Sequence, residues 1–374
     1  MEKELTCFLV VGRMGKSLTY SKAEPFVINP LIKRIYIFRE READALPKTV
    51  YITLPGWIAK IKPRFLSNFT RIIAEPVQLI SKALKVRPDI INGYHLIPKG
   101  INSLIAARLT GSKCILSLIG GVVEVETYSR FRWFLKRINL WALRETDLIT
   151  TKGTKVNSYL TKHDIATSKV LIYNGAIDLR KFYFDATVPK EIDVLFAGTF
   201  RKLKGPDRVL QMLALVKKDF PSLKACFIGE GYLYKYCVDM SEMLGLSENV
   251  SFAGYKEDTA AYFRKSKILV MPSRSEGLPT SMLEAMSCGC VPVVSNVGNI
   301  SDAATHSGNA FLINNYCDIK SFAEYIIKLL SDENLRAGMA QLGVQTVRDK
   351  YSATEQSKIV DHMIQKLYGK DGTF

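Results

Sequence analysis

Short apolar runs alternate with segments of helical periodicity along the whole 374-residue sequence, and this alternation constrains the fold more than any other feature. Strands that alternate with helices form parallel sheets joined by right-handed crossovers. Eleven or more strands exceed one comfortable sheet, so the sequence predicts an α/β protein with two Rossmann-like parallel-sheet domains. Strands are predicted at residues 7–11, 34–38, 49–54, 90–92, 114–118, 148–151, 170–173, 193–197, 224–228, 250–253, 268–271 and 291–295, and helices at 207–218, 232–244, 280–286 and 319–331.

The boundary between the two domains is predicted at residues 184–191, where the apolar periodicity lapses before a new strand begins. The charge changes at the same point. Residues 1–187 hold 30 basic and 15 acidic side chains, whereas the rest of the chain is almost neutral. We therefore expect a basic first domain over residues 1–185 and a second domain over 186–350. Residues 351–374 are expected to form a C-terminal helix that packs back on the first domain.

Cysteine usage and hydropathy indicate the compartment. The seven cysteines contain no Cys-x-x-Cys pair, and their scatter is typical of buried free thiols in a reducing compartment. The apolar stretch 7–11 is too short for a signal peptide, and the longest apolar run, 115–123, is about half of a membrane-spanning helix. We expect a cytoplasmic protein that lies peripherally on the inner face of the cell membrane.

The loop after the predicted strand 268–271 carries the most informative chemistry. Glu276 lies in this loop, and Glu284 lies about one turn inside a helix that Pro279 is suited to begin. Free backbone N–H groups at residues 277–281, together with the helix dipole, form a site for a diphosphate. Glu284 can then accept hydrogen bonds from a ribose diol, while Glu276 faces the group attached to the phosphate. The alternative is that both glutamates are ordinary solvent-exposed side chains.

The spacing of these glutamates, within Ser275-Glu-Gly-Leu-Pro and Leu283-Glu-Ala-Met, resembles the signature of retaining glycosyltransferase family 4. These are group 1 glycosyltransferases with the GT-B fold. The likeness extends through the second half of the chain and, more loosely, into the first half. The similar segments are 173–182, 196–205, 226–231 and 250–255, and the looser ones are 87–91 and 98–121.

The resemblance implies two Rossmann-like domains that face a central cleft, with a nucleotide-sugar donor on the second domain and the acceptor on the first. It implies transfer with retention of anomeric configuration and without a cofactor or a bound metal ion, and no Asp-x-Asp motif for a divalent cation occurs. By the same resemblance, Lys204 and Glu276 are the expected catalytic residues. The expected donor-binding residues are Gly198, Thr199, Arg201, Gly254, Tyr255, Gly277, Leu278, Pro279, Thr280, Ser281 and Glu284.

Three positions depart from the family pattern. Thr199 stands where the family often has an arginine, and either Arg201 substitutes for it or the phosphate is held by the lysine alone. Ile119 stands where a histidine often contacts the donor sugar. His95 is a candidate substitute, although a lone histidine is also a common structural residue. The segment 298–302 replaces the commoner Gly-Gly-x-x-Glu.

The glycine-bearing loop at residues 12–17 follows the first predicted strand and is similar to a P-loop. Val10 occupies the first glycine position and no metal-binding aspartate partner is found, which argues against a nucleotide hydrolase. We expect instead an acceptor-side loop in which Arg13 and Lys16 meet an acceptor phosphate. The expected acceptor-side residues are Gly12, Arg13, Gly15, Lys16, His95 and Gly120.

Two basic segments, 57–71 and 128–144, mix cations with aromatic side chains. In the first, Trp57 and Pro63 favour an exposed excursion that contacts a membrane. In the second, one helical stripe is expected to pack on the sheet and another to contact a membrane surface; the alternative is an ordinary helix with a solvated basic face. The packing stripe is Phe131, Phe134, Leu135, Ile138 and Trp141, and the membrane stripe is Trp133, Arg137, Leu140 and Arg144.

The predicted function is transfer of a sugar from a nucleoside diphosphate sugar to a lipid-linked glycan in cell-surface polysaccharide biosynthesis. The expected partners are the nucleotide-sugar donor, this acceptor and an anionic membrane surface, but no nucleic acid. The alternatives are a soluble acceptor, as in starch or sucrose metabolism, a nucleic-acid-binding protein that uses the basic half, and a catalytically inactive scaffold. No recognised nucleic-acid-binding module occurs, and the retained Glu276, Glu284 and Lys204 argue against the scaffold.

Overall fold

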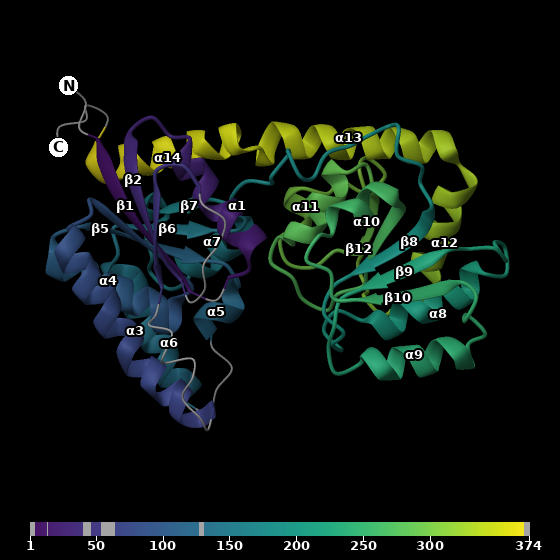
Figure 1. Cartoon of the computed structure of the whole chain (residues 1–374), viewed down its shortest axis with the longest axis horizontal. Coiled ribbons are helices and arrows are strands. Elements are labelled where there is room, and N and C mark those ends of the chain that lie inside the picture. Colours follow the sequence, from purple (N-terminus) through teal and green to yellow (C-terminus); the bar gives the residue numbers. More distant parts are fainter. Residues whose placement is uncertain (1–3, 13, 40–45, 54–63, 127–130, 370–374) are drawn as a thin grey trace. The chain divides into compact units, whose positions relative to one another are not determined.

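The chain divides into two compact units, and each contains one parallel sheet covered by helices (Figure 1). The predicted pair of Rossmann-like parallel-sheet domains is therefore confirmed. The structure is a computed structural model that describes residues 4–12, 14–39, 46–53, 64–126 and 131–369, without the side chains of residues 17 and 64–72. The first unit comprises Met1–Ala176 with Ala353–Phe374, and the second comprises Ile177–Ser352.

The sheet of the first unit has seven parallel strands in the order β3-β2-β1-β4-β5-β6-β7. Phe8 and Val10 of β1 point into a core shared with α3, α4 and α6, whereas Cys7 and Leu9 point into a core shared with α1 and α14. Burial on both faces explains why these strands are continuous apolar runs in the sequence. The strands are β1 (Leu5–Gly12), β2 (Ile32–Arg39), β3 (Thr49–Thr53), β4 (Ile90–Tyr94), β5 (Lys113–Leu118), β6 (Leu148–Thr151) and β7 (Val170–Ile172). The helices are α1 (Lys16–Val27), α3 (Arg64–Val86), α4 (Ile101–Thr110), α5 (Val122–Glu126), α6 (Arg132–Glu145), α7 (Thr154–Thr161) and α14 (Ala353–Tyr368), with short turns η1 (Leu96–Gly100) and η2 (Thr167–Lys169).

The C-terminal helix α14 belongs to the first unit. Val360 and Met363 are buried in the same core as Phe26 of α1. The Asn29 side-chain amide donates a hydrogen bond to Asp361 over 2.6 Å. These contacts return the end of the chain to the unit in which it begins.

The sheet of the second unit has six strands in the order β10-β9-β8-β11-β12-β13. The last strand, β13, was not predicted from the sequence. The strands are β8 (Ile192–Ala197), β9 (Ala225–Ile228), β10 (Val250–Gly254), β11 (Ser266–Met271), β12 (Val291–Ser295) and β13 (Phe311–Ile313). The helices are α8 (Pro206–Val216), α9 (Tyr234–Met243), α10 (Ala260–Lys265), α11 (Thr280–Ser287), α12 (Ile319–Ser331) and α13 (Glu333–Tyr351), with a short turn η3 (Ile300–Asp302).

The division between the units falls after Ala176, nine residues before the boundary placed at residue 185 from the sequence. Ile177 and Phe182 are buried in the core of the second unit. The Ile177 N–H also donates to the Tyr351 carbonyl, at the end of α13, over 2.8 Å. The lapse in periodicity therefore marks a loop inside the second unit rather than the boundary itself.

Helix α6 presents a different face to the sheet from the one predicted. The prediction that one stripe packs inward is wrong, because its members Phe131, Phe134 and Trp141 are exposed. Leu140, expected on the outer face, is buried. Small and polar side chains such as Asn139 complete the inner face. The inner face therefore could not be identified from the positions of the apolar residues alone. Of the other basic segment, residues 57–63 lie outside the described residues and 64–71 form the beginning of α3.

The strand order of each sheet reverses at one place. In the first sheet this switch point lies between β1 and β4, and in the second it lies between β8 and β11. Open parallel sheets bind ligands in the crevice outside the carboxyl ends of the strands at such a point. The loops that follow these four strands are therefore where each unit is expected to bind its ligand.

No helix among the described residues is long and apolar enough to cross a membrane. Six of the seven cysteines are buried free thiols, and Cys317 is exposed. Burial raises the pKa of the Cys290 thiol to about 12, which keeps it protonated at neutral pH.

Candidate functional site

Two loops of the second unit carry most of the predicted donor-site residues. One runs from the end of β8 to α8, and the other runs from the end of β11 to α11. Phe200 anchors the first loop, because its ring is fully buried against those of Phe196 and Phe227. The rest of that loop can therefore remain exposed without losing its position.

Hydrogen bonds to the backbone hold the two loops together. The Arg274 N–H donates to the Leu203 carbonyl over 2.8 Å. The Arg208 guanidinium of α8 donates to the Pro272 carbonyl over 2.7 Å. The ends of β8 and β11 thus form one connected edge.

An ammonium–carboxylate pair, Lys204 and Glu276, links the side chains of these loops. Lys204 Nζ donates to Glu276 Oε1 over 2.5 Å, and the two side chains are 27% and 8% exposed. The burial of Glu276 excludes the alternative in which it is a solvated loop residue. Because Lys204 keeps part of its surface in solvent, its ammonium can bind a further anion while it stays beside the carboxylate.

The loop after β12 supports the backbone at Glu276. The Asn299 N–H donates to the Gly277 carbonyl over 3.0 Å. Gly298 has a φ of +59°, and a Cβ atom there would lie 1.9 Å from the Glu276 carbonyl oxygen. The segment 298–302, which departs from the family pattern, therefore sets the position of the loop that carries Glu276.

Replacing Gly298 by alanine is expected to displace this loop. The left-handed backbone alone costs about 1–2 kcal/mol for a residue with a Cβ atom, and relief of the clash adds to that cost. We expect the variant to unfold at lower denaturant concentration and to bind the donor more weakly. Gly245→Ala is the matched control, because Gly245 has a φ of +66° but open space around its Cβ position. Equal donor binding by both variants would contradict the supporting role of residue 298.

Helix α11 begins directly after this loop, with Pro279 at its N-cap. The first-turn N–H groups, at Thr280 and Ser281, lack partners within the helix and so can donate to an anion. Leu278 and Pro279 are buried, so only their backbone can meet a ligand. Glu284, about one turn further, is only 9% exposed, which again excludes the solvent-exposed alternative.

The ends of β9 and β10 come to the same edge of the sheet. A Cβ atom at Gly229, whose φ is +132°, would lie 1.9 Å from the Gly198 carbonyl oxygen. The Gly229 N–H donates to the Gly254 carbonyl over 2.8 Å. Gly198 and Gly254, both expected in the donor site, are thereby brought together. The remaining predicted donor residues, Thr199, Arg201 and Tyr255, are exposed in the adjoining loops.

In the first unit, the Glu124 carboxylate joins two of the predicted acceptor-side residues. One oxygen lies 2.7 Å from His95 Nδ1 and accepts from the Leu96 N–H over 3.1 Å. The other accepts from the N–H groups of Ile119 and Gly120, each over 2.9 Å. Glu124 thus fixes both the histidine ring after β4 and the loop after β5.

The His95 backbone is held in a conformation that residues with a Cβ atom seldom adopt, with a φ of 70° and a ψ of 151°. Its N–H donates to the Ser117 carbonyl over 3.0 Å. Such strain persists only where surrounding contacts impose it, and it is concentrated at functional sites. The side chain remains 41% exposed, so the ring can meet a ligand at the carboxyl end of β4.

The loop after β1 lies beside η1, since β1 and β4 are neighbouring strands. A Cβ atom at Gly12 would lie 1.7 Å from Lys99 Nζ, so the Lys99 side chain crosses this loop. Gly15 and Lys16 are exposed at the start of α1. Arg13 lies outside the described residues.

Sequence reasoning missed Glu124 and Lys99. Glu124 lies in α5, four residues after Gly120 of the loop that follows β5, and a carboxylate so placed can accept from the loop's N–H groups. Lys99 lies next to the glycine that ends η1 and gave no comparable signal. The roles of all the site residues stay predictions, although the structure brings the described members of each group to one edge of its sheet.

Residues 181–345 match the family model described as glycosyl transferases group 1. The capsular polysaccharide biosynthesis glycosyltransferase CapM of Staphylococcus aureus is 23% identical over 304 residues, which cover 76% of this chain and 77% of the relative. The N-acetyl-alpha-D-glucosaminyl L-malate synthase of Bacillus anthracis is 22% identical over 276 residues, which cover 70% of this chain and 71% of the relative.

The fold is also that of solved structures. HepE of Anabaena, in complex with UDP-glucose, matches 97% of this chain and 100% of its own with a TM-score of 0.77 at 14% identity. Sucrose-phosphate synthase of Thermosynechococcus elongatus matches 98% of this chain and 99% of its own with a TM-score of 0.78 at 15% identity. At such low identity these matches establish the fold alone. Residues 181–345 thus match the group 1 glycosyltransferases, and the fold is that of GT-B glycosyltransferases.

Proposed function

We propose that the chain transfers a sugar, with retention of anomeric configuration, from a nucleoside diphosphate sugar to a lipid-linked glycan acceptor of cell-surface polysaccharide biosynthesis. The observation that carries the proposal is the Lys204–Glu276 pair at the carboxyl ends of β8 and β11, beside the N-terminus of α11. A positive side chain, a buried carboxylate and free helix N–H groups lie together at the switch point of the second sheet.

The diphosphate of the donor fits the start of α11. The N–H groups of Thr280 and Ser281 and the Lys204 ammonium donate to its oxygens, so negative charge that develops on the leaving group is stabilised where it forms. Lys204 supplies this charge without a bound metal ion. The C1–oxygen bond to the diphosphate breaks, the acceptor oxygen bonds to C1 on the same face, and the acceptor proton passes to the leaving phosphate.

The two glutamates then take different parts of the donor. Glu284 accepts hydrogen bonds from the ribose diol, each worth about 1.5–3 kcal/mol because the acceptor is charged. Glu276 lies on the Lys204 side of the site and contacts the transferred sugar. Gly254 and Tyr255, at the end of β10, lie beside the base. The UDP-glucose bound to HepE of Anabaena supports a nucleotide-sugar donor for this fold.

The acceptor side belongs to the first unit. Lys16 lies at the start of α1, directly after the β1 loop, and the Lys99 side chain crosses that loop. Both offer positive charge to an acceptor phosphate. His95, fixed by Glu124, offers its second ring nitrogen to a sugar hydroxyl. The naming of CapM as a capsular polysaccharide enzyme supports a cell-surface glycan as the product.

Retention can be tested without knowing the acceptor by letting water take its place. The protein is incubated with UDP-glucose, and the anomer of the first glucose released is followed by proton NMR. The donor is α-linked, so we expect α-glucose to appear before mutarotation produces the β form. Release of β-glucose first would contradict retention. Lys204→Ala, which removes the ammonium, serves as the control for enzyme-dependent release once its thermal unfolding has been measured in parallel.

A further inference from the structure

Helix α6 of the first unit exposes large aromatic side chains to solvent. Trp133, Phe134 and Trp141 are 65%, 52% and 49% exposed, and Phe131 at the N-cap of the helix is exposed as well. Scattered apolar residues are normal on a protein surface, but several aromatic residues on one helix mark a binding surface. None of these side chains belongs to the acceptor-side group around Glu124.

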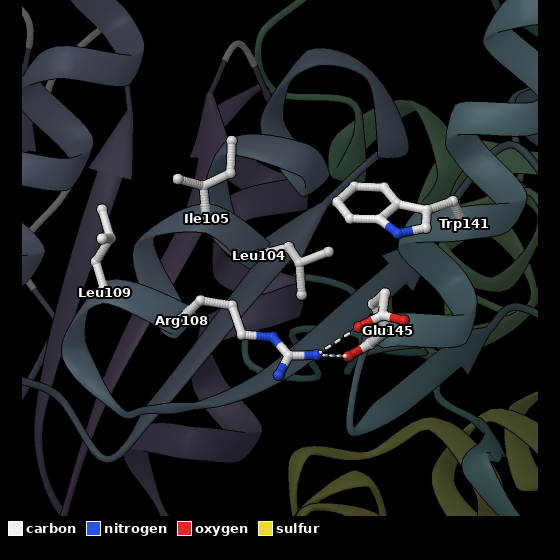
Figure 2. Close-up of a pocket in the computed structure, with 6 residues that line it drawn as sticks. All are labelled: Leu104, Ile105, Arg108, Leu109, Trp141 and Glu145. Carbon is white, nitrogen blue, oxygen red and sulfur yellow. Dashed lines mark hydrogen bonds and ion pairs between the residues drawn. The ribbon is translucent and has the colours of Figure 1, made fainter.

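The exposed apolar surface continues onto the neighbouring helices α4 and α3. Helix α4 packs against both α3 and α6, and the three lie side by side in Figure 1. In Figure 2, Ile105 and Leu109 of α4 and Trp141 of α6 surround a pocket of about 180 Å³. Exposed apolar side chains of α3 extend the surface. We define the aromatic face as Phe131, Trp133, Phe134 and Trp141 of α6, Ile105 and Leu109 of α4, and Ile73, Val77 and Leu84 of α3.

Positive charge accompanies the aromatic face. The helices α3, α4 and α6 contain nine basic and two acidic residues in their sequences. One of the two acidic side chains, Glu145, accepts a hydrogen bond from Arg108 over 2.8 Å at the edge of the pocket (Figure 2). Arg132 and Arg137 are exposed on α6 among its aromatic residues. The first unit as a whole carries almost all of the chain's net charge of +16.

We propose that the aromatic face docks on an anionic lipid bilayer. Tryptophan and phenylalanine insert at the boundary between headgroups and acyl chains, and arginines around them bind anionic headgroups. The combination distinguishes a bilayer from a nucleic acid, which needs the cations but not the apolar area. The proposal deepens the proposed function, since a lipid-linked acceptor lies in such a bilayer, but it does not depend on the donor chemistry.

Flotation with lipid vesicles tests the proposal on the full-length protein. We expect the protein to float with vesicles of phosphatidylcholine containing about 30% phosphatidylglycerol and to float much less with phosphatidylcholine alone. Binding should weaken as salt is raised, because the charge contribution is screened. A protein that does not float with the anionic vesicles at low salt would overturn the proposal.

Two pairs of substitutions separate the apolar and charged contributions. Trp133→Ser with Trp141→Ser, and separately Arg132→Glu with Arg137→Glu, should each weaken vesicle binding at least tenfold. Both pairs change exposed side chains, so the thermal unfolding temperature should stay close to that of the wild type. Tyr232→Ser with Tyr236→Ser is the matched control, because these aromatic side chains are equally exposed but lie on the second unit. Equal loss in the control and the test pairs would overturn the assignment to α6.

Tryptophan fluorescence gives an independent readout of contact. The chain contains three tryptophans, so Trp57→Phe leaves only Trp133 and Trp141. We expect their emission to shift to shorter wavelength on anionic vesicles and to be quenched by lipids brominated in the acyl chain. Vesicle binding without shift or quenching would show that another surface makes the contact. A dimer that forms through α6 and leaves vesicles unbound would likewise contradict the proposal, whereas failure of sugar transfer alone would bear only on the proposed function.

Discussion

Replacing Lys204 by alanine is expected to lower the rate of sugar transfer by about two to three orders of magnitude. A positioned donor that stabilises charge developing on a leaving group contributes this much in other enzymes. In the proposed reaction Lys204 has that role, because its ammonium lies 2.5 Å from Glu276 Oε1 and its side chain is partly exposed. The measurement is kcat for donor hydrolysis or transfer at saturating donor.

The expected loss arises from two effects that further variants separate. Removal of the ammonium also leaves the Glu276 carboxylate, which is only 8% exposed, without its cation. Lys204→Ala with Glu276→Gln removes that unpaired charge, and kcat should remain low if the leaving group needs the ammonium. Lys202→Ala is the matched control, since Lys202 is an exposed residue of the same loop. A Lys204→Ala enzyme that turns over like the Lys202→Ala enzyme would contradict the assignment.

Replacing Glu284 by alanine is expected to weaken binding of the donor nucleotide about a hundredfold. Two hydrogen bonds from a ribose diol to a charged acceptor are worth roughly 3 kcal/mol or more together, and 1.4 kcal/mol corresponds to a factor of ten. The loss should appear in the dissociation constant, while kcat at saturating donor falls less, because the ribose does not react. Calorimetric titration of the nucleoside diphosphate measures the dissociation constant directly.

The control for Glu284 must separate lost contacts from lost stability. Because Glu284 is nearly buried, the thermal unfolding of Glu284→Ala must be measured in parallel before its nucleotide affinity is compared with that of the wild type. Glu324→Ala changes a glutamate on the outer side of α12 and should leave both quantities unchanged. If Glu284→Ala binds the nucleotide like Glu324→Ala, the ribose contact is excluded.

The central strands of both sheets were predictable because their residues are buried on both faces. Strands such as β1 and β11 are continuous apolar runs, since both faces of a parallel sheet are covered. The strand β13 was not predicted, although its residues Phe311–Ile313 are also apolar. The neighbourhood of Glu276 and Glu284 was predictable because a strand, a loop with Gly277 and Pro279, and a helix start follow each other within one short segment.

Contacts between distant segments could not be predicted from local patterns. Glu124 joins His95 to the loop at Gly120, a contact that depends on the neighbouring positions of β4 and β5 in the sheet. The orientation of α6 was misjudged because its apolar residues lie on more than one side. Packing of small residues such as Ala142 against the sheet decided which side faces inward.

Calorimetric titration of a panel of nucleoside diphosphates tests whether the edge formed by β8, β11 and α11 binds the donor. We expect that one of these nucleotides binds the wild-type protein at one site. Binding should be weakened strongly by Lys204→Ala and Glu284→Ala and left unchanged by Lys202→Ala and Glu324→Ala. Nucleotide binding that none of the four substitutions alters would contradict this expectation.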